Sequence, residues 1–361
     1  MSEEKYKRFA KATVSPRISI TTGVELLDRS GHGVLLVCGE EDKLIGVVTD
    51  GDIRRALLQG IPFDRDIAMI CNKTPLVARE GVTRAEALRL MDTGRGFIVN
   101  QLPVVDYSGK LVDLILRSDL TGEELLPLSA VIMAGGGGTR LRPLTENVPK
   151  PMLNVSGKPI LEHIINQLRG AGIRSITITT HYLGEQISTY FGDGRKFGVT
   201  IDYLAEEKPM GTGGALGLMN FTGETVLVMN GDILTQVNFR AMFDFHREHG
   251  ADLTMGTRLY EFQVPFGVVE CDDVTIRSLV EKPVQAFFVN AGIYFVQKPV
   301  LSHIPKEVSY NMTDLVQRLL AERGKVVSFP IREYWLDIGR VSDYNSVASE
   351  YGSSRDDGSR E

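Results

Sequence analysis

The sequence predicts an α/β protein of two domains, in which an α+β domain precedes a domain built on a mostly parallel sheet. Three observations lead to this prediction. The chain has 361 residues, and a common single domain has about 100–200. The first third contains an internal repeat of short strand and helix patterns. A continuous apolar run at 131–134 then opens a longer strand–helix alternation, and buried runs of this kind are typical of parallel sheets.

The composition indicates a folded globular protein. Hydrophobic residues make up 43% of the chain and charged residues 24%, which excludes general disorder. No apolar run is long enough for a membrane span, and the first residues lack the apolar core of a signal peptide. The net charge of −6 argues against nonspecific nucleic-acid binding, which requires a basic surface. We therefore expect no nucleic-acid or membrane partner.

The three cysteines are Cys38, Cys71 and Cys271, and they form no C-x-x-C pair. Neither a disulfide framework nor a zinc site is indicated, and a reducing cytoplasm fits best. We place the domain boundary near Pro127, which gives a first domain at 1–127 and a second at 128–350. The small and charged residues 351–361 read as a flexible tail.

The first domain contains two copies of one pattern, at 33–60 and at 102–126. Each copy gives a strand, a turn, a second strand and then an aspartate that opens a helix as its N-cap. These aspartates, Asp52 and Asp119, are 67 residues apart. A helical stretch precedes each strand pair. A hydroxyl lies three residues before the first aspartate, at Thr49, whereas Leu116 takes that place in the second copy.

This arrangement resembles a tandem CBS domain pair over residues 8–125, most closely at GVVTDGDI, residues 46–53. The resemblance implies a regulatory module that binds an adenosine nucleotide or a related metabolite. The hydroxyl and the ribose-binding aspartate of the family correspond to Thr49 and Asp52, and only Asp119 matches in the second copy. The alternative is that Thr49 is an ordinary strand residue and Asp52 only caps a helix.

The second domain opens with a strand followed by Gly135, Gly136, Gly137 and Gly138. Glycines let backbone N–H groups approach phosphate oxygens, and we expect an anion there to meet the start of the next helix. The sequence fits neither the Walker phosphate loop nor the dinucleotide G-x-G-x-x-G pattern, because Arg140 stands where each requires glycine. Arg140 and Lys150 add two cations, which suits the polyphosphate of a nucleoside triphosphate.

The run GGGGTRLRPLT at 135–145, followed by Lys150-Pro151, resembles the signature of sugar-1-phosphate nucleotidyltransferases, in particular guanylyltransferases. The resemblance covers about residues 129–350 and implies a Rossmann-like, GT-A-like sheet. It implies nucleotide binding by Ala134, by the four glycines and by Thr139. The loop AEEKPMGTGGAL at 205–216 matches the family's base-binding loop, with Glu206, Glu207 and Gly211 as candidates.

Three further segments match the same family. Gly231-Asp232 ends an apolar strand, where the family's aspartate binds a metal ion. EKP at 281–283 and NAG at 290–292 imply that Glu281, Lys282 and Asn290 bind the sugar phosphate. Asp337, in EYWLDIGR, corresponds to the second metal carboxylate, and Arg340 stands where the family often has threonine. The role of Arg340 is open.

The implied reaction joins a nucleoside triphosphate to a sugar 1-phosphate and releases pyrophosphate. The sugar phosphate is already an anion near neutral pH, because its second pKa is about 6, so no general base is required. We expect Mg²⁺ on Asp232 and Asp337, with Arg140 on the leaving pyrophosphate, Lys150 at the α-phosphate and Lys282 on the sugar phosphate. No histidine belongs to these motifs, and we expect His246 and His249 on an exposed helix face.

The resemblance favours GTP and a mannose-, heptose- or hexosamine-type sugar 1-phosphate, as in surface glycan biosynthesis. A carboxylate in the base loop accepts from guanine but equally from uracil or thymine, so UTP and dTTP remain alternatives. Two other readings are a catalytically silent nucleotide-sensing subunit and a cytidylyltransferase acting on a sialic-type acid. The CBS pair implies a nucleotide-type effector and a homodimer. The sequence leaves the sugar, the effector and the direction of its effect open.

Overall fold

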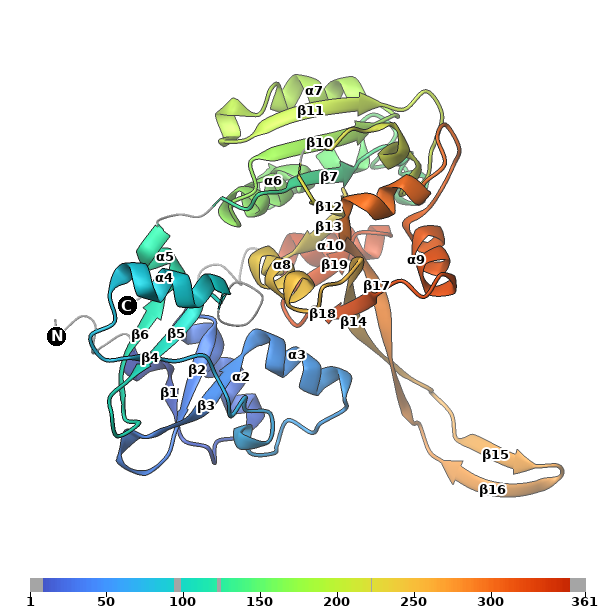
Figure 1. The fold of residues 1–361 in the computed structure, drawn as a ribbon. Coiled ribbons are helices and arrows are strands. Elements are labelled where there is room, and N and C mark those ends of the chain that lie inside the picture. Colours follow the sequence, from blue (N-terminus) through green and yellow to red (C-terminus); the bar gives the residue numbers. More distant parts are fainter. Residues whose placement is uncertain (1–8, 94–98, 122–124, 222, 351–361) are drawn as a thin grey trace. The chain divides into compact units, whose positions relative to one another are not determined.

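The structure is a computed structural model that describes residues 9–93, 99–121, 125–221 and 223–350 (Figure 1). The chain divides into two compact units. Unit 1 comprises residues 1–126 and 239–250, and unit 2 comprises 127–238 and 251–361. The sequence analysis places the boundary near Pro127, and the structure adds a segment of the second half, 239–250, to the first unit.

Unit 1 contains two copies of one strand–helix arrangement. In each copy the first strand is parallel to the second, which pairs antiparallel with the third. The first copy comprises β1 (Thr13–Val14), α2 (Ile20–Ser30), β2 (Val34–Cys38), β3 (Leu44–Thr49) and α3 (Asp50–Leu58). The second comprises β4 (Ala78–Arg79), α4 (Arg84–Thr93), β5 (Gln101–Val105), β6 (Leu111–Leu116) and α5 (Arg117–Thr121). The short 3-10 helices Glu40–Asp42 and Ile67–Met69 also lie in this unit.

The two copies share a hydrophobic core. Leu111 and Leu114 of β6 pack in one buried cluster with Val34, Leu36 and Val47 of the first copy. Helix α8 (Phe239–Glu248) completes unit 1, although it comes from the second half of the sequence. His246 on α8 is fully buried, so the expectation of an exposed face is wrong for this residue.

Unit 2 is built on a seven-stranded, mostly parallel sheet, as the apolar strand patterns predict. Its strand order is β11-β10-β7-β12-β17-β14-β18, and β17 alone runs antiparallel to its neighbours in this sheet. The strands are β7 (Ser129–Met133), β10 (Ser175–Thr180), β11 (Thr200–Ala205), β12 (Thr225–Asn230), β14 (Leu253–Gln263), β17 (Val284–Gln297) and β18 (Val326–Pro330). Helices α6 (Ile160–Gly170), α7 (Gly184–Phe191), α9 (Met312–Ala321) and α10 (Val341–Glu350) accompany it.

The core of unit 2 lies between the sheet and α9. Val131 of β7 and Val228 of β12 pack in one cluster with Met312, Leu315 and Leu319 of α9. Burial of such side chains contributes about 1.5–3 kcal/mol each. None of the helices in the described ranges is long and apolar enough to cross a membrane.

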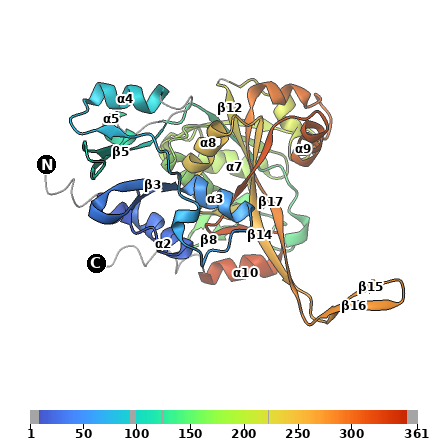
Figure 2. The ribbon, with the colours of Figure 1, turned by 60° about the horizontal axis from the view of Figure 1, so that its bottom comes forward.

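Shorter elements surround the sheet. Strand β13 (Ile233–Thr235) pairs with β19 (Trp335–Asp337), and β8 (Asn154–Val155) pairs with β9 (Lys158–Pro159). The 3-10 helices are Thr139–Leu141, Lys150–Met152, Arg195–Phe197, Gly214–Leu218 and Lys298–His303. Strands β14 and β17 run on as a two-stranded ribbon to a terminal hairpin of β15 (Val268–Asp272) and β16 (Thr275–Val280), which leaves the sheet in both views (Figures 1 and 2).

Candidate active site

The glycine loop follows β7 at the edge where the neighbouring parallel strands also end. Its first turn is anchored, because Ala134 N donates to Thr179 O at 3.1 Å and Gly231 N donates to Met133 O at 2.9 Å. A Cβ built on Gly231 would lie 2.9 Å from Met133 O, so only glycine fits between these two strand ends. The loop is thus fixed at the carboxyl end of the sheet, where α/β proteins bind ligands.

The middle of the loop is open. A Cβ built on Gly136 meets no atom within 4 Å, whereas one on Gly138 would lie 3.0 Å from Thr145 Cβ. Gly138 also has a left-handed φ of +60° and accepts a 2.7 Å hydrogen bond from Thr145 Oγ1. The expectation of a following helix is wrong, because only one 3-10 turn, Thr139–Leu141, follows. So short a turn has little macrodipole, and the loop's own backbone is left to bind the anion.

The predicted base loop brings one of its two glutamates to the glycine loop. Glu206 is buried and accepts from Met210 N at 3.1 Å, and its Oε1 lies 3.1 Å from a Cβ built on Gly135. Glu207 is exposed. Gly211 has φ +74°, and a Cβ there would lie 2.7 Å from Tyr310 O. Glu206 and Gly211 therefore shape this side of the site, whereas Glu207 is exposed to solvent.

Asp232, Asp337 and Lys150 come together from three distant segments. Asp232 directly follows β12, and the antiparallel pairing of β13 with β19 sets Ile233 opposite Asp337. The Lys150 ammonium contacts Asp232 Oδ2 and lies 3.8 Å from Asp337 Oδ1. Lys150 is buried and Asp337 is half-exposed. The register of a two-stranded pairing therefore assembles the predicted carboxylate pair around one cation.

The surroundings of this cluster disfavour the ionised form of Asp337. Desolvation, and then the nearby Asp232 carboxylate, raise the pKa of Asp337, against the opposing effects of Lys150 and Arg140. Arg140 is an exposed side chain whose Nη1 lies 3.8 Å from a Cβ built on Gly339. All four predicted catalytic residues thus belong to one neighbourhood.

The cluster fits a divalent cation such as Mg²⁺. Asp232 Oδ1 is buried and has no hydrogen-bond partner, so it keeps a lone pair for a ligand. In the described part of the chain, no group of three or more His, Cys, Asp or Glu side chains forms a preassembled metal cage. Mg²⁺ does not require one, since it is held by one or two carboxylates together with water and substrate phosphates.

Asn290 and Arg340 have local partners. Asn290 Nδ2 donates to Tyr294 Oη, and Asn290 Oδ1 accepts from Gly292 N at 3.0 Å. Arg340 has an exposed side chain, and its backbone N donates to Asp343 Oδ2 at 2.7 Å at the start of α10. Arg340 thus directly precedes α10, and this backbone role accounts for its position without a phosphate contact.

The structure does not bring Glu281 and Lys282 to this cluster. Both lie in the ribbon next to β16, and both are exposed. Lys282 N donates to Phe266 O at 3.3 Å, within the same ribbon, and Lys282 has a left-handed φ of +48°. The residues of the predicted sugar-phosphate subsite are therefore split, with Asn290 at the base of the ribbon and the other two beyond it.

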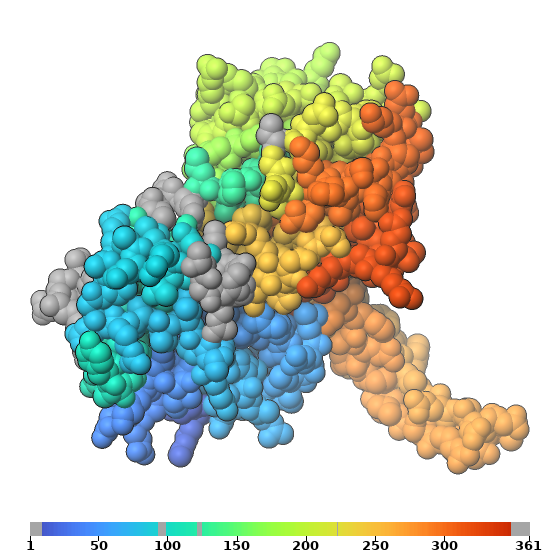
Figure 3. All heavy atoms as spheres, viewed as in Figure 1, coloured from blue at the N-terminus to red at the C-terminus, as the bar shows by residue number. Residues whose placement is uncertain are grey.

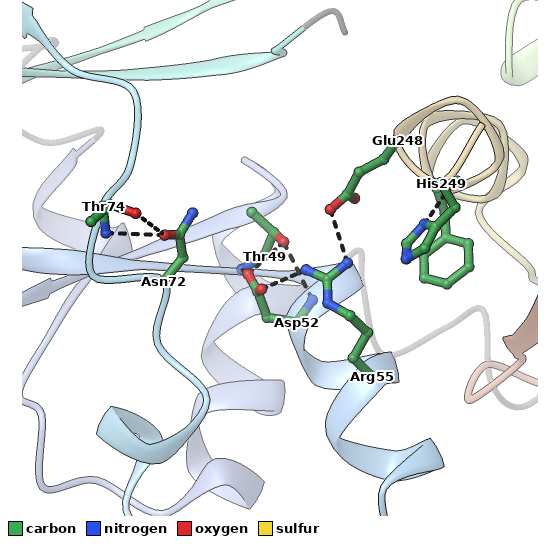
Figure 4. Close-up of polar contacts among 8 residues, drawn as sticks. Thr49, Asp52, Arg55, Asn72, Thr74, Glu248 and His249 are labelled. Carbon is green, nitrogen blue, oxygen red and sulfur yellow. Dashed lines mark hydrogen bonds and ion pairs between the residues drawn. The ribbon is translucent and has the colours of Figure 1, made fainter. Parts of the chain in front are cut away.

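The predicted regulatory residues form a capping box in unit 1 (Figure 4). Asp52 is not the N-cap that the sequence analysis expects. Thr49 is the N-cap, and Asp52 Oδ2 accepts from Thr49 N at 2.8 Å and from Thr49 Oγ1 at 2.7 Å. The N-cap position has the extended backbone found at the end of β3, whereas Asp52 already lies inside the helix.

Two charged residues that the sequence analysis missed complete this cluster. Arg55 Nη2 donates to Asp52 Oδ1 at 2.6 Å, and Arg55 Nη1 donates to Glu248 Oε1 of α8 at 2.9 Å (Figure 4). The i,i+3 spacing of Asp52 and Arg55 could have indicated their contact. Glu248 had no sequence signal, because it lies 193 residues away.

In the second copy, α5 begins at Arg117, so Asp119 lies in its first turn and not at the N-cap. Arg117 N donates to Asn100 O at 2.9 Å, and Arg117 forms an ion pair with Asp92. The Asn100 side chain in turn donates to Asp244 of α8. Helix α8 therefore contacts both copies.

Comparison with known proteins gives two family matches. The nucleotidyl transferase model matches residues 129–354, and the CBS domain model matches residues 10–59 and 65–125. A mannose-1-phosphate guanylyltransferase of Mycobacterium tuberculosis is 36% identical over 228 residues, which cover 60% of this chain and 62% of the relative. A UTP–glucose-1-phosphate uridylyltransferase of Synechocystis is 33% identical over 238 residues, 60% of this chain and 61% of the relative. The chain thus spans about three fifths of the length of these curated relatives.

A shorter relative is matched almost completely. The D-glycero-α-D-manno-heptose 1-phosphate guanylyltransferase of Aneurinibacillus thermoaerophilus is 34% identical over 229 residues, 62% of this chain and 98% of the relative. The crystal structure of HddC from Yersinia pseudotuberculosis superposes with a TM-score of 0.50 at 26% identity, covering 62% of this chain and 99% of that chain. These similarities concern the half of the chain that holds the cluster of Lys150, Asp232 and Asp337.

Replacing Asp337 with asparagine should stabilise the metal-free protein slightly. A carboxyl whose pKa is raised by folding destabilises the fold as the pH rises through that pKa, and asparagine removes this cost. We expect the Tm at neutral pH to rise by about 1–2 °C, and this gain to shrink as the pH is lowered. Thermal denaturation at several pH values measures both effects, with the exposed Asp202→Asn as control. A lower Tm for Asp337→Asn at neutral pH would contradict the prediction.

Proposed function

The chain belongs to the nucleotidyl transferase family and carries two CBS domains ahead of that family's domain, and on this premise we propose its reaction. We propose that it transfers a guanylyl group from GTP to a sugar 1-phosphate of the mannose, heptose or hexosamine type. The products are a GDP-sugar and pyrophosphate. The mannose- and heptose-1-phosphate guanylyltransferases among its relatives support this choice.

One observation carries the proposal. Lys150 lies between Asp232 and Asp337 at the sheet edge where the open glycine loop also lies. The backbone N–H groups of the loop can donate to phosphate oxygens. With a cation and two carboxylates beside it, such a loop suits a reaction that brings two anions together. A binding module would need the loop but not this charged cluster.

The chemistry is a displacement at the α-phosphorus. An oxygen of the sugar phosphate forms a bond to this phosphorus, and the bond to the pyrophosphate oxygen breaks. The attacking oxygen is anionic near neutral pH because its pKa is about 6, so no side chain has to remove a proton. Catalysis then depends on holding the two phosphates in line and on offsetting their charge.

The residues of this chain supply that positioning. Gly136 faces open space and Gly137 is exposed, so their backbone N–H groups can donate to the triphosphate. Arg140 is placed to hold the leaving pyrophosphate, and Lys150 to offset charge at the α-phosphate. Asp232 and Asp337 would hold Mg²⁺, which when bound supplies positive charge to the phosphate oxygens.

Glu206 is the candidate acceptor for the base. It is the buried glutamate beside the glycine loop, and because its Oε2 accepts from Met210 N, we assign Oε1 to the base. One oxygen accepts from guanine N1–H or from uracil N3–H alike, so the choice of GTP rests on the guanylyltransferases among the relatives. A uridylyltransferase among the relatives makes UTP the main competitor.

The test is pyrophosphate release over a matrix of nucleoside triphosphates and sugar 1-phosphates, with and without Mg²⁺. We expect turnover with GTP and one of the three sugar classes, and none after Mg²⁺ is chelated. Turnover with UTP or dTTP alone would refute the guanylyl assignment and keep the reaction. Calorimetric binding of a triphosphate without turnover on any sugar would instead indicate a nucleotide-sensing subunit.

We also propose that the reaction takes place in the cytoplasm. Cys38, Cys71 and Cys271 are all free thiols. Free thiols persist in a reducing compartment, and oxidising compartments favour disulfides.

We propose that a nucleotide-type effector binds unit 1 at Thr49 and Asp52. Carboxylates commonly accept from ribose hydroxyls, and Asp52 is presently shared between Thr49 and Arg55. An effector that takes Asp52 oxygens competes with Arg55, whose other contact is Glu248 at the end of α8. Asp232 is followed along the chain by β13 and then by α8. A shift of α8 would therefore act on a segment that leads directly to the proposed metal site.

Replacing Asp52 with alanine should change only the response to effector. We expect the basal rate to stay within about twofold, because Asp52 belongs to unit 1 and every proposed catalytic group belongs to unit 2, while the effector's half-maximal concentration rises at least about tenfold. Steady-state assays with titrated nucleotides measure both values. Asp52→Asn keeps a capping acceptor and controls for folding, and the exposed Asp64→Ala is the surface control. A large loss of basal rate in Asp52→Asn would contradict a purely regulatory role.

A further inference from the structure

The long ribbon of unit 2, residues 258–289, projects from the body of the sheet; we refer to it as the arm. Its stem is the outer part of β14 paired with the outer part of β17, from Arg258 opposite Val289 to Gln263 opposite Val284. Its tip is the β15–β16 hairpin. Figure 3 shows the same arm in space-filling form, extending from the rest of unit 2.

The stem exposes apolar side chains on both faces. Tyr260 stands opposite Phe287 with Phe262 next to them on one face, and all three are more than half exposed. Phe288 and Val284 lie on the other face and are 40% and 59% exposed. A two-stranded ribbon in water is marginally stable, and an apolar patch of this kind on both faces marks a contact surface. Within the described residues, apolar side chains on both faces of the stem stay about half exposed.

The tip has one apolar face and one mixed face, on which the Val268–Val280 pair lies beside Glu270. Val269 pairs with Leu279, and Cys271 with Ile276, so these four exposed side chains share one face. Glu270 lies on the other face, where it accepts from Ser278 at 2.9 Å. In the described part of the chain, the hydrogen bonds and ion pairs that the tip makes connect it only to itself and to the adjoining stem. A hairpin with a continuous exposed apolar face is suited to lie on another surface.

The arm also carries two residues of the predicted sugar-phosphate subsite, and one of them has a left-handed backbone conformation. Glu281 and Lys282 lie where the tip joins the stem. Glu281 Oε2 is 2.9 Å from a Cβ built on Gly267, so this carboxylate lies close to the backbone just before β15. Lys282 has φ +48°, a conformation that costs about 1–3 kcal/mol for a residue with a side chain. This bend, which local backbone hydrogen bonds hold, presents a glutamate and a lysine to solvent.

We propose that the arm of each chain docks on a second copy of this chain, and that Glu281 and Lys282 enter the partner copy's active site. The inference rests on the proposed function, because it assigns these residues to the sugar 1-phosphate of that reaction. An exchange of arms related by a two-fold axis gives each copy one complete site, made of its own Lys150, Asp232 and Asp337 and of the partner's arm.

The residues that the arm carries indicate that the protein on which it docks is a second copy of this chain. The site in the body has to accept a second phosphate, yet Lys150 is already paired with Asp232 and lies near Asp337. Lys282 supplies the additional positive charge, and Glu281 an acceptor for sugar hydroxyls. A different protein would cover the apolar faces but would leave these two residues outside any site of this chain.

The decisive experiment is complementation between two inactive full-length chains. Lys282→Ala has an intact body and a defective arm, and Asp232→Asn has a defective body and an intact arm. We co-express them with different tags and purify the mixed dimer on both tags in sequence. Each homodimer should show at most about 1% of wild-type turnover, whereas the mixed dimer should show about half, because one of its two sites is complete.

The alternative gives a different result. If each arm serves its own chain, the mixed dimer has one site without Lys282 and one without Asp232, and it stays as inactive as its parents. Failure to recover any dimer carrying both tags would equally overturn the proposal. Glu281→Ala in place of Lys282→Ala repeats the test with a residue whose loss leaves the lysine in place.

A second measurement does not depend on activity. Cys271 is the exposed thiol, and burial raises the pKa of both Cys38 and Cys71 to about 11, so a maleimide reacts fastest at Cys271. We express ¹⁵N-labelled and unlabelled protein separately, attach a maleimide-benzophenone to Cys271 of both, mix the two so that subunits exchange, and irradiate. Peptide mapping should find the tip joined to unit 2 of the other isotope, and Cys271→Ser should give no cross-link. Cross-links confined to single chains would refute arm exchange, even if wild-type protein turns over no substrate and the proposed function itself fails.

Discussion

Replacing Asp232 with asparagine is expected to lower turnover by on the order of 10³-fold while leaving the fold intact. Asparagine keeps the size of the side chain but removes a full negative charge. The buried Oδ1 of Asp232, which has no partner in the protein, then becomes a much weaker ligand for Mg²⁺. The loss should appear in kcat, because the charge acts on phosphate oxygens as the bond is exchanged.

The measurement is pyrophosphate release at saturating substrates, together with the Tm and the calorimetric affinity for GTP. We expect Mg²⁺ to raise the Tm of the wild type in the presence of nucleotide and to have little effect on Asp232→Asn. The exposed Asp202→Asn on β11 is the matched control and should retain wild-type kinetics. Retention of more than about a tenth of wild-type turnover by Asp232→Asn would rule out a metal role for this residue.

The glycine loop and the ends of the parallel strands were predictable because their signals are local. An apolar run that ends in four glycines identifies both β7 and the loop. Asp232 follows a second apolar strand, and parallel strands place their carboxyl ends on one edge of a sheet. These two features lie within short stretches of sequence, so they required no knowledge of tertiary packing.

The contacts within the cluster were not predictable in the same way. Asp337 meets Asp232 only because β19 pairs with β13, in a register that sets Asp337 opposite Ile233. The sequence analysis named Asp337 by resemblance and not by any physical signal. The same limit applies to Glu206 and Glu207, because neighbouring residues of equal chemistry point differently once the strand ends, and only Glu206 is buried.

Two further differences arise from contacts between distant segments. The sequence analysis expected His246 on an exposed helix face, but α8 belongs to unit 1 and His246 is fully buried. The EKP motif predicted a sugar-phosphate subsite, and the structure places Glu281 and Lys282 on the arm. A sequence motif predicts which residues bind a ligand, but it does not predict which copy of the chain supplies them.

Replacing Lys150 with methionine is expected to abolish turnover and also to destabilise the protein. Methionine keeps much of the buried alkyl chain but removes the only charge that contacts Asp232 in the described structure. The two carboxylates then repel one another, and the pKa of Asp337 rises further because Lys150 no longer lowers it. We expect a loss of about 1–2 kcal/mol in the free energy of unfolding, less than for a fully buried pair because Asp337 is half-exposed.

Magnesium separates the two roles of Lys150. A divalent cation bound by the carboxylates replaces the lost charge, so Mg²⁺ should raise the Tm of Lys150→Met more than that of the wild type. Turnover should stay on the order of 10³-fold low, because the ammonium that offsets charge at the α-phosphate is still missing. The exposed Lys158→Met, which loses an ion pair between β9 and Glu162 in the first turn of α6, is the matched control and should keep its activity. If Mg²⁺ restored both stability and turnover to Lys150→Met, this lysine would be a counter-ion of the resting site and would have no part in the reaction.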